Sequence, residues 1–288
     1  MTVLTEREVN RSDLGKPGFF DRLAKMDLST STKTSNLNII YYVGLAVRGS
    51  FPEVVGVTSE RIRSSWLRSY VEQLVTRDAS ELVSGTNSAK LRGYFEALSL
   101  NTAGLIASSS LHQAVGITAK TARQYDDLLV DLGVAVDVPA WSTNRLQRLE
   151  KRAKRCIIDG GLVTAGARIN RETALTDADL LGRLIDSFVH AQRVPEAELA
   201  VHPIRLHHLR TANGRQEIDL VAELPGGKVV GIETKAAAAV GRGDARHLAW
   251  LCDQLVDRFA AGVVLHTGPD TFEPGDRILA APISAIWT

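Results

Sequence analysis

Four charged side chains near the C-terminus are spaced so that they could act together. Glu217 and Asp219 lie in one apolar stretch. Glu233 and Lys235 lie in a second, after a Leu-Pro-Gly-Gly-Lys turn. Pro and Gly are turn formers, and the β-branched residues on both sides are typical of strands. A hairpin centred on Gly226 places Asp219 directly opposite Glu233. The same register places Glu217 opposite Lys235.

Side chains two residues apart on a strand project from the same face of the sheet. The four charged side chains are therefore expected on one face, and the opposite face is expected to carry Ile218, Leu220, Ile232 and Thr234. Three acids and a lysine on one patch are costly unless something compensates their charge, and like charges directly opposite each other are unfavourable in a structural pair. A divalent cation is the expected compensation, because hard cations take carboxylate oxygens as ligands.

The order Asp219, Glu233, Lys235 has the spacing of a site for metal-dependent phosphodiester hydrolysis. Asp219 and Glu233 would hold Mg²⁺ as a Lewis acid that lowers the pKa of the attacking water, and Lys235 would orient or activate that water. The lysine would also stabilise the negative charge that develops in the reaction. Glu217 is expected to be auxiliary. The alternatives are an inactive relic of such a site and a patch of exposed cross-strand ion pairs.

Length and composition limit the class of protein. The chain has 288 residues and a formal net charge of +1, so any surface that binds nucleic acid must be local. Its two cysteines, Cys156 and Cys252, have no Cys-x-x-Cys spacing, which argues against a disulfide framework or a zinc ribbon. No apolar run is long enough to span a membrane, and the N-terminus does not have the pattern of a signal peptide. The sequence therefore predicts a soluble cytoplasmic protein without a membrane partner.

Several common catalytic motifs are absent from the sequence. There is no Gly-x-Ser-x-Gly elbow, no His-Glu-x-x-His metal site and no Rossmann glycine pattern. The segment 85–90 lacks the second glycine and the Ser/Thr of a Walker A loop, so no ATP site is expected. His207 and His208 are adjacent and would face opposite ways on a strand. His202 and His247 are predicted to be surface or packing residues.

The first half of the chain has a helical pattern. Apolar spacing predicts helices over 19–23, 37–47 and 89–98, and a further helix from Ser59 onward. Residues 110–141 then have the order of a winged helix-turn-helix.

In that segment a short helix over 111–115 is followed by a turn, and Thr118 is a suitable N-cap for a second helix that ends at Gly133. A short strand over 134–138 would lead into the wing.

The second helix of such a module lies in the major groove in its DNA-binding members. The residues that would face the groove are Thr118, Lys120, Thr121, Arg123 and Gln124. Three aspartates follow on the same helix, so docking to another protein is the alternative.

The most basic stretch of the chain follows the wing. Six of the eleven residues from Arg145 to Arg155 are basic and one is acidic. Such a segment could contact phosphate groups. Its candidates for nucleic-acid binding are Arg148, Lys151, Arg152 and Arg155. The alternative is a solvated face of a helix or an edge strand.

The C-terminal part alternates helices and strands around the hairpin. The predicted elements are a helix over 179–191 that carries Asp186, a strand over 202–209, a helix over 244–259, and strands over 262–266 and 277–282. This order predicts an α/β domain, in a chain that is α+β overall. A domain boundary is expected near residues 150–170.

Short motifs run in order along most of the chain. They are Gly49-Ser50-Phe51-Pro52-Glu53; Trp66-Leu67-x2-Tyr70 with Arg77-Asp78; Thr121-x3-Tyr125-x3-Leu129 with Leu132; Lys154-x4-Asp159-x-Gly161-Leu162; Arg210-Thr211 before Glu217-Ile218-Asp219; and Ile232-Glu233-Thr234-Lys235. With them the chain resembles the C-terminal part of prokaryotic AAA-type ATPases that carry a C-terminal domain of unknown function. The resemblance implies a winged helix followed by a fold like that of restriction-endonuclease-like, PD-(D/E)XK, nucleases.

The resemblance also implies a division of the chain. Residues 1–60 would be a helical remnant after an absent ATPase module, 61–160 a helical winged-helix domain, and 161–288 a nuclease-like α/β domain. Because the Walker motifs are missing, the chain is expected to be a natural short form, a fragment or the partner of a separate ATPase. The helix before the hairpin carries a glutamate in the family, and Asp186 at the matching position is expected to be an auxiliary site residue.

Two functions are consistent with these residues. The first is a DNA-associated protein with a nuclease-like domain that performs Mg²⁺-dependent phosphodiester hydrolysis. The second is a non-catalytic DNA- or protein-binding module that forms the regulatory part of an AAA-type ATPase system. A likeness of fold does not choose between them.

Overall fold

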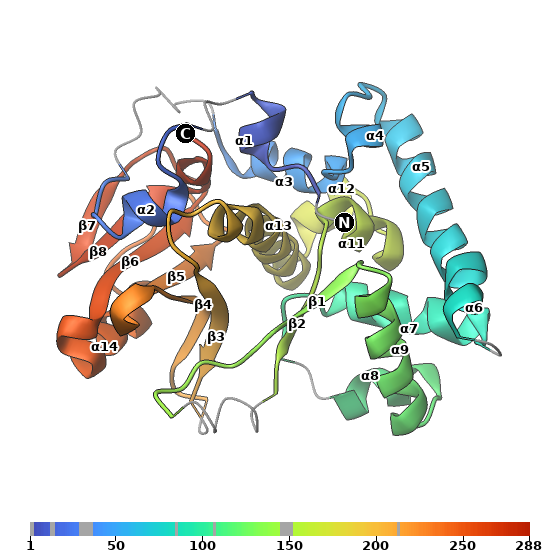
Figure 1. The fold of residues 1–288 in the computed structure, drawn as a ribbon. Coiled ribbons are helices and arrows are strands. Elements are labelled where there is room, and N and C mark those ends of the chain that lie inside the picture. The colour runs from blue at the N-terminus through green and yellow to red at the C-terminus, as the bar shows by residue number, and fades with distance from the viewer. Residues whose placement is uncertain are drawn as a thin grey trace. The chain divides into compact units, whose positions relative to one another are not determined.

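The computed structural model describes residues 3–11, 15–28, 37–83, 86–105, 108–144, 152–211 and 214–288. The protein is of the α+β class, with a helical N-terminal half and a sheet-rich C-terminal half (Figure 1), as the sequence predicts. It divides into two compact units. The first unit comprises Met1–Leu4, Val43–Asp137 and Lys154–Phe188; the second comprises Thr5–Tyr42, Val138–Ala153 and Val189–Thr288. The three domain ranges implied by the family resemblance stay a prediction.

The first unit is mostly helical. Its elements include α3 (Ile39–Arg48), α4 (Pro52–Val55), α5 (Glu60–Gln73), a π-helical turn (Leu74–Asp78), α6 (Ala79–Leu82), α7 (Ser88–Leu100), α8 (Ser108–Val115), α9 (Ala119–Asp131), β1 (Ala135–Val138), β2 (Lys154–Ile157), α11 (Gly160–Ala167), α12 (Arg171–Thr176) and the start of α13 (Ala178–Glu198). Helix α3 begins in the second unit, and α13 ends there.

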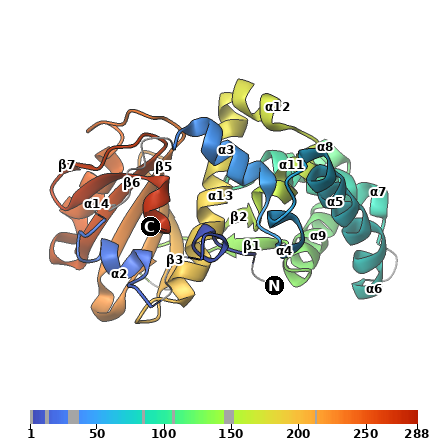
Figure 2. The same cartoon turned by 90° about the horizontal axis from the view of Figure 1, so that it is seen from above.

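Helix α11 packs against α5 and α7 in the centre of the first unit (Figure 2). It is apolar on all sides, as expected of a helix that is covered all round. An aromatic cluster of Phe51, Trp66 and Tyr70 lies beside α5, with the Trp66 and Tyr70 rings stacked at a centroid distance of 5.4 Å. Two of the motifs that run along the chain therefore meet in this cluster.

Asp159 joins a third motif to the one that contains Ser50 and Phe51. Its carboxylate caps α11 by accepting the Leu162 N–H at 2.8 Å, and it accepts the N–H of Ser50 at 2.7 Å. Complete burial raises the pKa of Asp159 to about 6, although these backbone hydrogen bonds oppose the shift. The Asp-x-Gly motif is thus accounted for by helix capping and by contact with the segment that follows α3.

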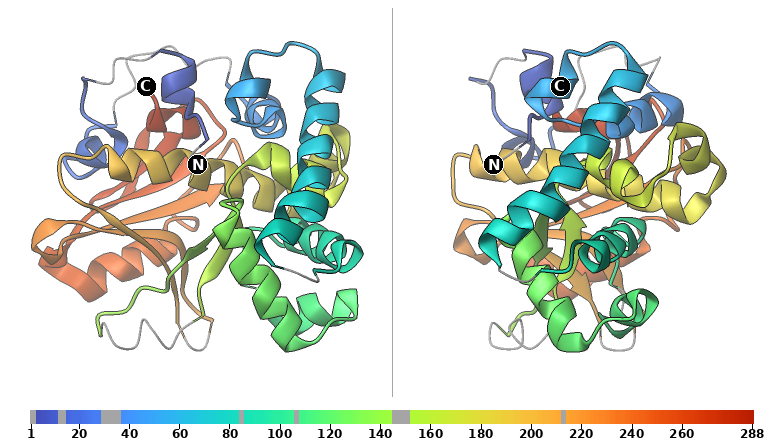
Figure 3. Two further views of the ribbon diagram at one scale, coloured as in Figure 1. Left: turned by 45° about the vertical axis from the view of Figure 1, so that its right-hand side comes forward. Right: turned by 90° about the vertical axis from the view of Figure 1, so that its right-hand side faces the viewer.

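Helices α7, α8 and α9 pack together, shown in green in Figure 3, and a two-stranded sheet of β1 and β2 follows them in the chain. The predicted N-cap is confirmed, because Thr118 accepts the Thr121 N–H at 3.1 Å. The predicted short strand is confirmed as β1. The buried side of α9 carries Ala122, Tyr125 and Leu129.

The second unit is built on a six-stranded mixed sheet of order β3-β4-β5-β6-β8-β7. The strands are β3 (Arg205–Arg210), β4 (Glu217–Glu223), β5 (Val229–Lys235), β6 (Phe259–His266), β7 (Phe272–Gly275) and β8 (Ile278–Pro282). Strands β5, β6 and β8 are parallel, while β4 is antiparallel to both β3 and β5. The carboxyl ends of β5, β6 and β8 therefore lie at one edge of the sheet.

Helix α14 (Arg246–Leu255) covers one face of this sheet. Leu248 and Leu251 pack in an apolar cluster with Val221 of β4 and Val264 of β6. Gly231 in β5 permits the approach, because a Cβ atom at this position would lie 2.6 Å from Leu248 Cδ2. The close contact fixes α14 over the centre of the sheet.

The N-terminal helices α1 (Glu6–Val9) and α2 (Phe19–Leu23) belong to the second unit. Glu196 of α13 holds them through a buried ion pair with Arg7 at 3.2 Å and by accepting the N–H of Phe19 at 3.0 Å. Such a pair is costly to break because either partner alone would be a buried charge. Across the ranges given above, no helix has the length and apolar character needed to cross a membrane.

Some elements differ from the sequence predictions. Helix α13 continues to Glu198, beyond the predicted end at residue 191, and contains Pro195. No sequence pattern predicted β2, α11, α12 or β7. Part of the basic stretch forms β2, where Lys154 is buried.

Candidate functional site

The hairpin has the predicted register. Its Cα partners run from Glu223–Val229 to Leu220–Ile232, which centres the turn on Gly226. Gly226 has φ +71°, a left-handed conformation that glycine adopts without strain. The pattern of strand residues and turn formers was therefore sufficient to predict this pairing.

Asp219 lies just beyond the last of these pairs. Its Oδ2 accepts the backbone N–H of Thr234 at 2.9 Å. At this end of the β4–β5 ladder, a side-chain carboxylate thus accepts the hydrogen bond of a backbone N–H group. This hydrogen bond fixes Asp219 beside the carboxyl end of β5. The residue that donates it, Thr234, directly follows Glu233 in the sequence.

Glu233 and Lys235 form an ion pair at that end of β5, with 3.3 Å between Lys235 Nζ and Glu233 Oε2. The Glu233 side chain is 4% exposed and the Lys235 side chain is 35% exposed. The Glu233 carboxylate is therefore buried, whereas its basic partner Lys235 is partly exposed to solvent. His266 is the Cα partner of Lys235 on β6, so the histidine lies at the same sheet edge.

The predicted division of the two sheet faces is wrong at Ile218. Ile218 packs in the same apolar cluster as Val221, although strict alternation would put them on opposite faces. The β3–β4 register shifts between His207 and Leu209, which is the signature of a β-bulge. The extra residue falls beside Asp219 and Leu220, so it changes the direction of side chains at the candidate site.

His247 of α14 also belongs to this site. Its Nδ1 lies 2.5 Å from Oε1 of Gln216, the residue before β4. Burial lowers the pKa of His247, Arg246 and Lys235 lower it further, and Glu217 and Asp219 oppose the shift.

The histidine was not among the predicted site residues. Nothing in the spacing of a single helical histidine indicates that the helix returns to the start of β4, so the sequence carried no signal for it.

The two predicted auxiliary residues, Glu217 and Asp186, lie in different units. Glu217 forms a half-exposed ion pair with Arg210 of β3 at 3.7 Å, in the second unit. Asp186 lies in the part of α13 that belongs to the first unit. The hairpin site is therefore described from Asp219, Glu233, Lys235 and their neighbours in the second unit alone.

The carboxylates of the hairpin fit a magnesium ion only in part. Among the residues with described positions, no group of three or more His, Cys, Asp or Glu side chains is arranged to hold a metal. Asp219 and Glu233 provide carboxylate oxygens, and Mg²⁺ is commonly held by one or two carboxylates together with water and substrate phosphates. The donor set thus suits Mg²⁺ that binds with a phosphate-bearing substrate better than an ion enclosed by protein ligands.

Two of the predicted nucleic-acid contacts lie on α9. Lys120 and Arg123 are exposed, and neither forms an ion pair with another described residue. Thr118 and Thr121 use their polar groups in the helix cap instead. The helix therefore presents two available cations.

The basic stretch is used in several ways. Arg148 and Lys151 lie outside the described residues. Arg152 is exposed, and its carbonyl group lies 3.0 Å from His208 Nε2. Arg155 pairs with Asp126 at 2.5 Å and with Asp137 at 3.1 Å, so its charge is neutralised within the first unit.

Two family models match the chain. Residues 41–173 match a domain of unknown function, DUF8612, and residues 181–286 match another domain of unknown function, DUF4143. DUF4143 is typically found in proteins associated with AAA ATPases. The family matches thus agree with the ATPase association that the sequence motifs imply, and they carry no statement of activity.

Two curated relatives are uncharacterized proteins from Mycobacterium bovis and Mycobacterium tuberculosis. Each is 28% identical to the chain over 244 residues, which make up 85% of the chain and 53% of the relative. The chain therefore spans about half the length of the curated relatives it matches. Both relatives are bacterial, in agreement with the prokaryotic family expected from the sequence.

Proposed function

We propose that the chain is a DNA-associated protein whose second unit performs Mg²⁺-dependent phosphodiester hydrolysis at the hairpin. The observation that carries the proposal is the placement of Asp219, Glu233 and Lys235 where β4 and β5 stop pairing, at the carboxyl edge of the parallel strands. Ligands commonly bind outside the carboxyl ends of strands in open α/β sheets. We infer from this placement a nuclease-like fold of the PD-(D/E)XK kind.

Each residue would have a distinct role. Asp219 and Glu233 would hold Mg²⁺, which, when bound, supplies Lewis-acid stabilisation of a phosphate group. Asp219 is oriented for this by the Thr234 N–H. Lys235 would release its ion pair with Glu233 and stabilise the charge that develops on the phosphate.

His247 and Gln216 would position the neighbouring strand. Burial and nearby cations lower the His247 pKa, so the ring is neutral near pH 7 and can exchange a hydrogen bond with Gln216 without adding charge. We assign His247 as a positioning residue and not as a proton donor.

DNA association is proposed for the first unit as well. The order α7, α8, α9 followed by the β1–β2 sheet supports a winged helix. Lys120 and Arg123 on the exposed side of α9 are the groups that would contact phosphates.

A metal titration tests the hydrolytic proposal. Mg²⁺ or Mn²⁺ should raise the melting temperature of the wild type but not of Asp219→Asn, which keeps an oxygen for the Thr234 N–H. Glu273→Gln is the matched control, because Glu273 is an exposed acid on β7 at the far end of the same sheet. Plasmid and single-stranded DNA should be cleaved by the wild type and by this control only.

A different function is favoured if neither metal stabilisation nor cleavage occurs. The closed Glu233–Lys235 ion pair, and the finding that the chain spans about half the length of its curated relatives, support a non-catalytic DNA- or protein-binding module. Such a module would regulate an AAA-type ATPase encoded in the same or a separate chain. Co-purification with that ATPase, in the absence of cleavage, would establish the alternative.

A further inference from the structure

A pocket of about 510 Å³ lies wholly within the first unit, between α5, α7 and the segment that joins α11 to α12. Its volume is within the range of small-molecule sites. Leu67, Val71 and Phe95 provide apolar lining, and polar side chains from α5, α7, α11, α12 and the segment between α11 and α12 line the rest. It is separate in sequence from the hairpin site and from α9.

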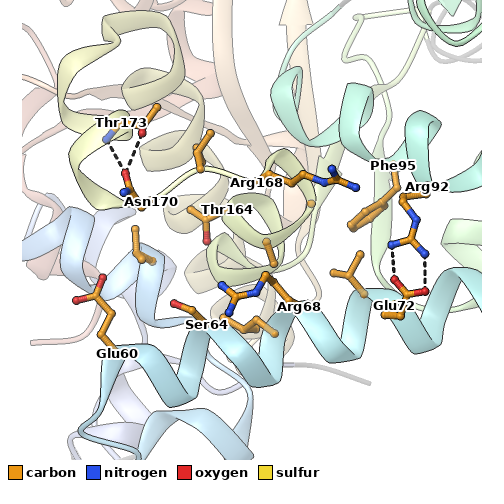
Figure 4. A pocket seen from close by; sticks show the side chains of 16 residues that line it. Glu60, Ser64, Arg68, Glu72, Arg92, Phe95, Thr164, Arg168, Asn170 and Thr173 are labelled. Atoms are coloured by element: carbon orange, nitrogen blue, oxygen red, sulfur yellow. Dashed lines mark hydrogen bonds and ion pairs between the residues drawn. The ribbon is translucent and has the colours of Figure 1, made fainter.

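Arg68 is the charged group that distinguishes this pocket. Figure 4 shows its side chain extending from α5, between Ser64 and the Arg92–Glu72 pair. Among the described residues it has neither a hydrogen bond nor an ion pair, and it is exposed. Its guanidinium group therefore keeps its donors for a ligand.

The other two arginines of the pocket are already paired. Arg92 forms a two-pronged ion pair with Glu72, and one of its two hydrogen bonds, from Nη2 to Oε1, is 2.5 Å long. Arg168 pairs more loosely with Glu96, at 3.6 Å, and both of these side chains are exposed. A ligand could recruit Arg168, since an exposed pair of this kind contributes little to stability.

Further donors line the same pocket. Ser64 is one helical turn from Arg68 on α5, and its hydroxyl group has no partner among the described residues. Asn170 uses its Oδ1 to accept the N–H and hydroxyl of Thr173, which leaves its amide NH₂ for another acceptor. A guanidinium, a hydroxyl and an amide are together suited to an anion with several acceptor oxygens.

Glu60 restricts the class of ligand. It lies at the opposite end of the pocket from the Arg92–Glu72 pair, as Figure 4 shows, and has no partner among the residues described. A free carboxylate favours a ligand that brings a hydroxyl or amino group to this end. We propose that the pocket binds a small organic phosphate monoester, with Arg68 holding the phosphate and Glu60 accepting a hydrogen bond from the remainder of the ligand.

Titration calorimetry with adenosine 5′-monophosphate tests the proposal, with adenosine as the neutral probe. We expect saturable binding of the monophosphate, at least tenfold weaker binding by Arg68→Gln, and no binding of adenosine. Arg61→Gln is the matched control, because Arg61 is exposed on the same helix but does not line the pocket. Glu60→Gln should weaken binding of the monophosphate but not of inorganic phosphate.

The phosphate could belong to a free metabolite or to the end of a nucleic acid. A short oligonucleotide with a 5′-phosphate, compared with the same strand ending in a 5′-hydroxyl, separates these sources. If the wild type prefers the strand with the 5′-phosphate and Arg68→Gln loses this preference, the proposal is supported and a strand end is identified as the source of the phosphate. The proposal is overturned if no phosphate probe binds saturably, or if Arg61→Gln and Arg68→Gln weaken binding equally.

Discussion

Two buried carboxylates, one in each unit, are surrounded by different kinds of partner. In the first unit, Asp126 of α9 accepts a hydrogen bond from the Tyr94 hydroxyl at 2.5 Å and pairs with Arg155, which also pairs with Asp137. Burial raises the pKa of Asp126, while Tyr94 and Arg155 oppose the shift. We refer to Tyr94, Asp126, Asp137 and Arg155 as the Asp126 cluster. Its members come from α7, α9, β1 and β2 of the same unit.

In the second unit, Glu233 pairs with a lysine on its own strand, and that lysine is 35% exposed. Asp219 accepts a backbone N–H group at the end of the β4–β5 ladder. The comparison indicates that buried charge alone does not mark a functional site. A carboxylate whose basic partner is open to solvent is better placed to exchange that partner for a ligand than Asp126, whose cation Arg155 is 20% exposed and also pairs with Asp137.

The largest expected effect breaks the Asp126 cluster. Arg155→Met should lower the free energy of unfolding by about 3 to 5 kcal/mol, because it leaves Asp126 as a buried charge without its cation. Urea denaturation followed by circular dichroism measures this loss. Arg123→Met, on the exposed side of α9, should change stability by no more than about 0.5 kcal/mol. Equal stability of the two variants would show that Arg155 is not a structural residue.

The hairpin site should respond in the opposite way. Lys235→Gln should lower the rate of DNA cleavage by about 100-fold, since it removes a donor for the developing charge. Its stability should fall less than that of Arg155→Met, because Lys235 is 35% exposed and Arg155 is 20% exposed, so water replaces the lysine more readily. Initial rates on plasmid DNA and urea denaturation of the same sample give both values. A stability loss as large as that of Arg155→Met, with an unchanged rate, would remove the difference between the two regions.

The sequence contained enough information to predict the hairpin register. The turn residues around Gly226 and the alternation of strand residues are local signals. The position of Ile218 was not predictable, because the bulge arises from pairing with β3 and not from the hairpin itself.

Long-range partners were equally hidden in the sequence. Arg155 appeared to be part of a phosphate-binding stretch, but Asp126 and Asp137 lie far before it in the chain. Ser50 and Asp159 were recognised as parts of separate motifs, and only the fold brings them together. Local patterns thus predicted elements and register, whereas the choice between structural and available charges required tertiary contacts.

Asp159 provides a third buried carboxylate with which to sharpen the comparison. Its pKa is raised from 3.8 to about 6, so the folded state binds more protons than the unfolded state between these values. Its contribution to stability is therefore fully present below about pH 4 and is lost as the pH rises through 6. The loss should amount to about 2 to 3 kcal/mol.

Asp159→Asn isolates this contribution, since the amide does not titrate in that range. The stability of the wild type relative to this variant, measured in urea, should be greater at pH 4.5 than at pH 7. The constant offset from replacing one acceptor oxygen is the same at both values. A difference that does not change with pH would mean that folding does not raise the pKa of Asp159.

The smallest expected effect concerns the exposed cations of α9, the helix whose buried side holds Asp126. Lys120→Gln with Arg123→Gln should weaken DNA binding to a similar extent on all sequences and reduce the slope of log affinity against log salt by about 2, one for each phosphate contact. Fluorescence anisotropy at several salt concentrations measures the slope. Asp127→Asn, also exposed on α9, is the control and should not reduce it. An unchanged slope in the double variant would mean that α9 does not lie against DNA. Lys120 and Arg123 do not belong to the buried side of α9, so the double variant keeps the packing of this helix. An unchanged slope would therefore favour a winged helix that docks to protein.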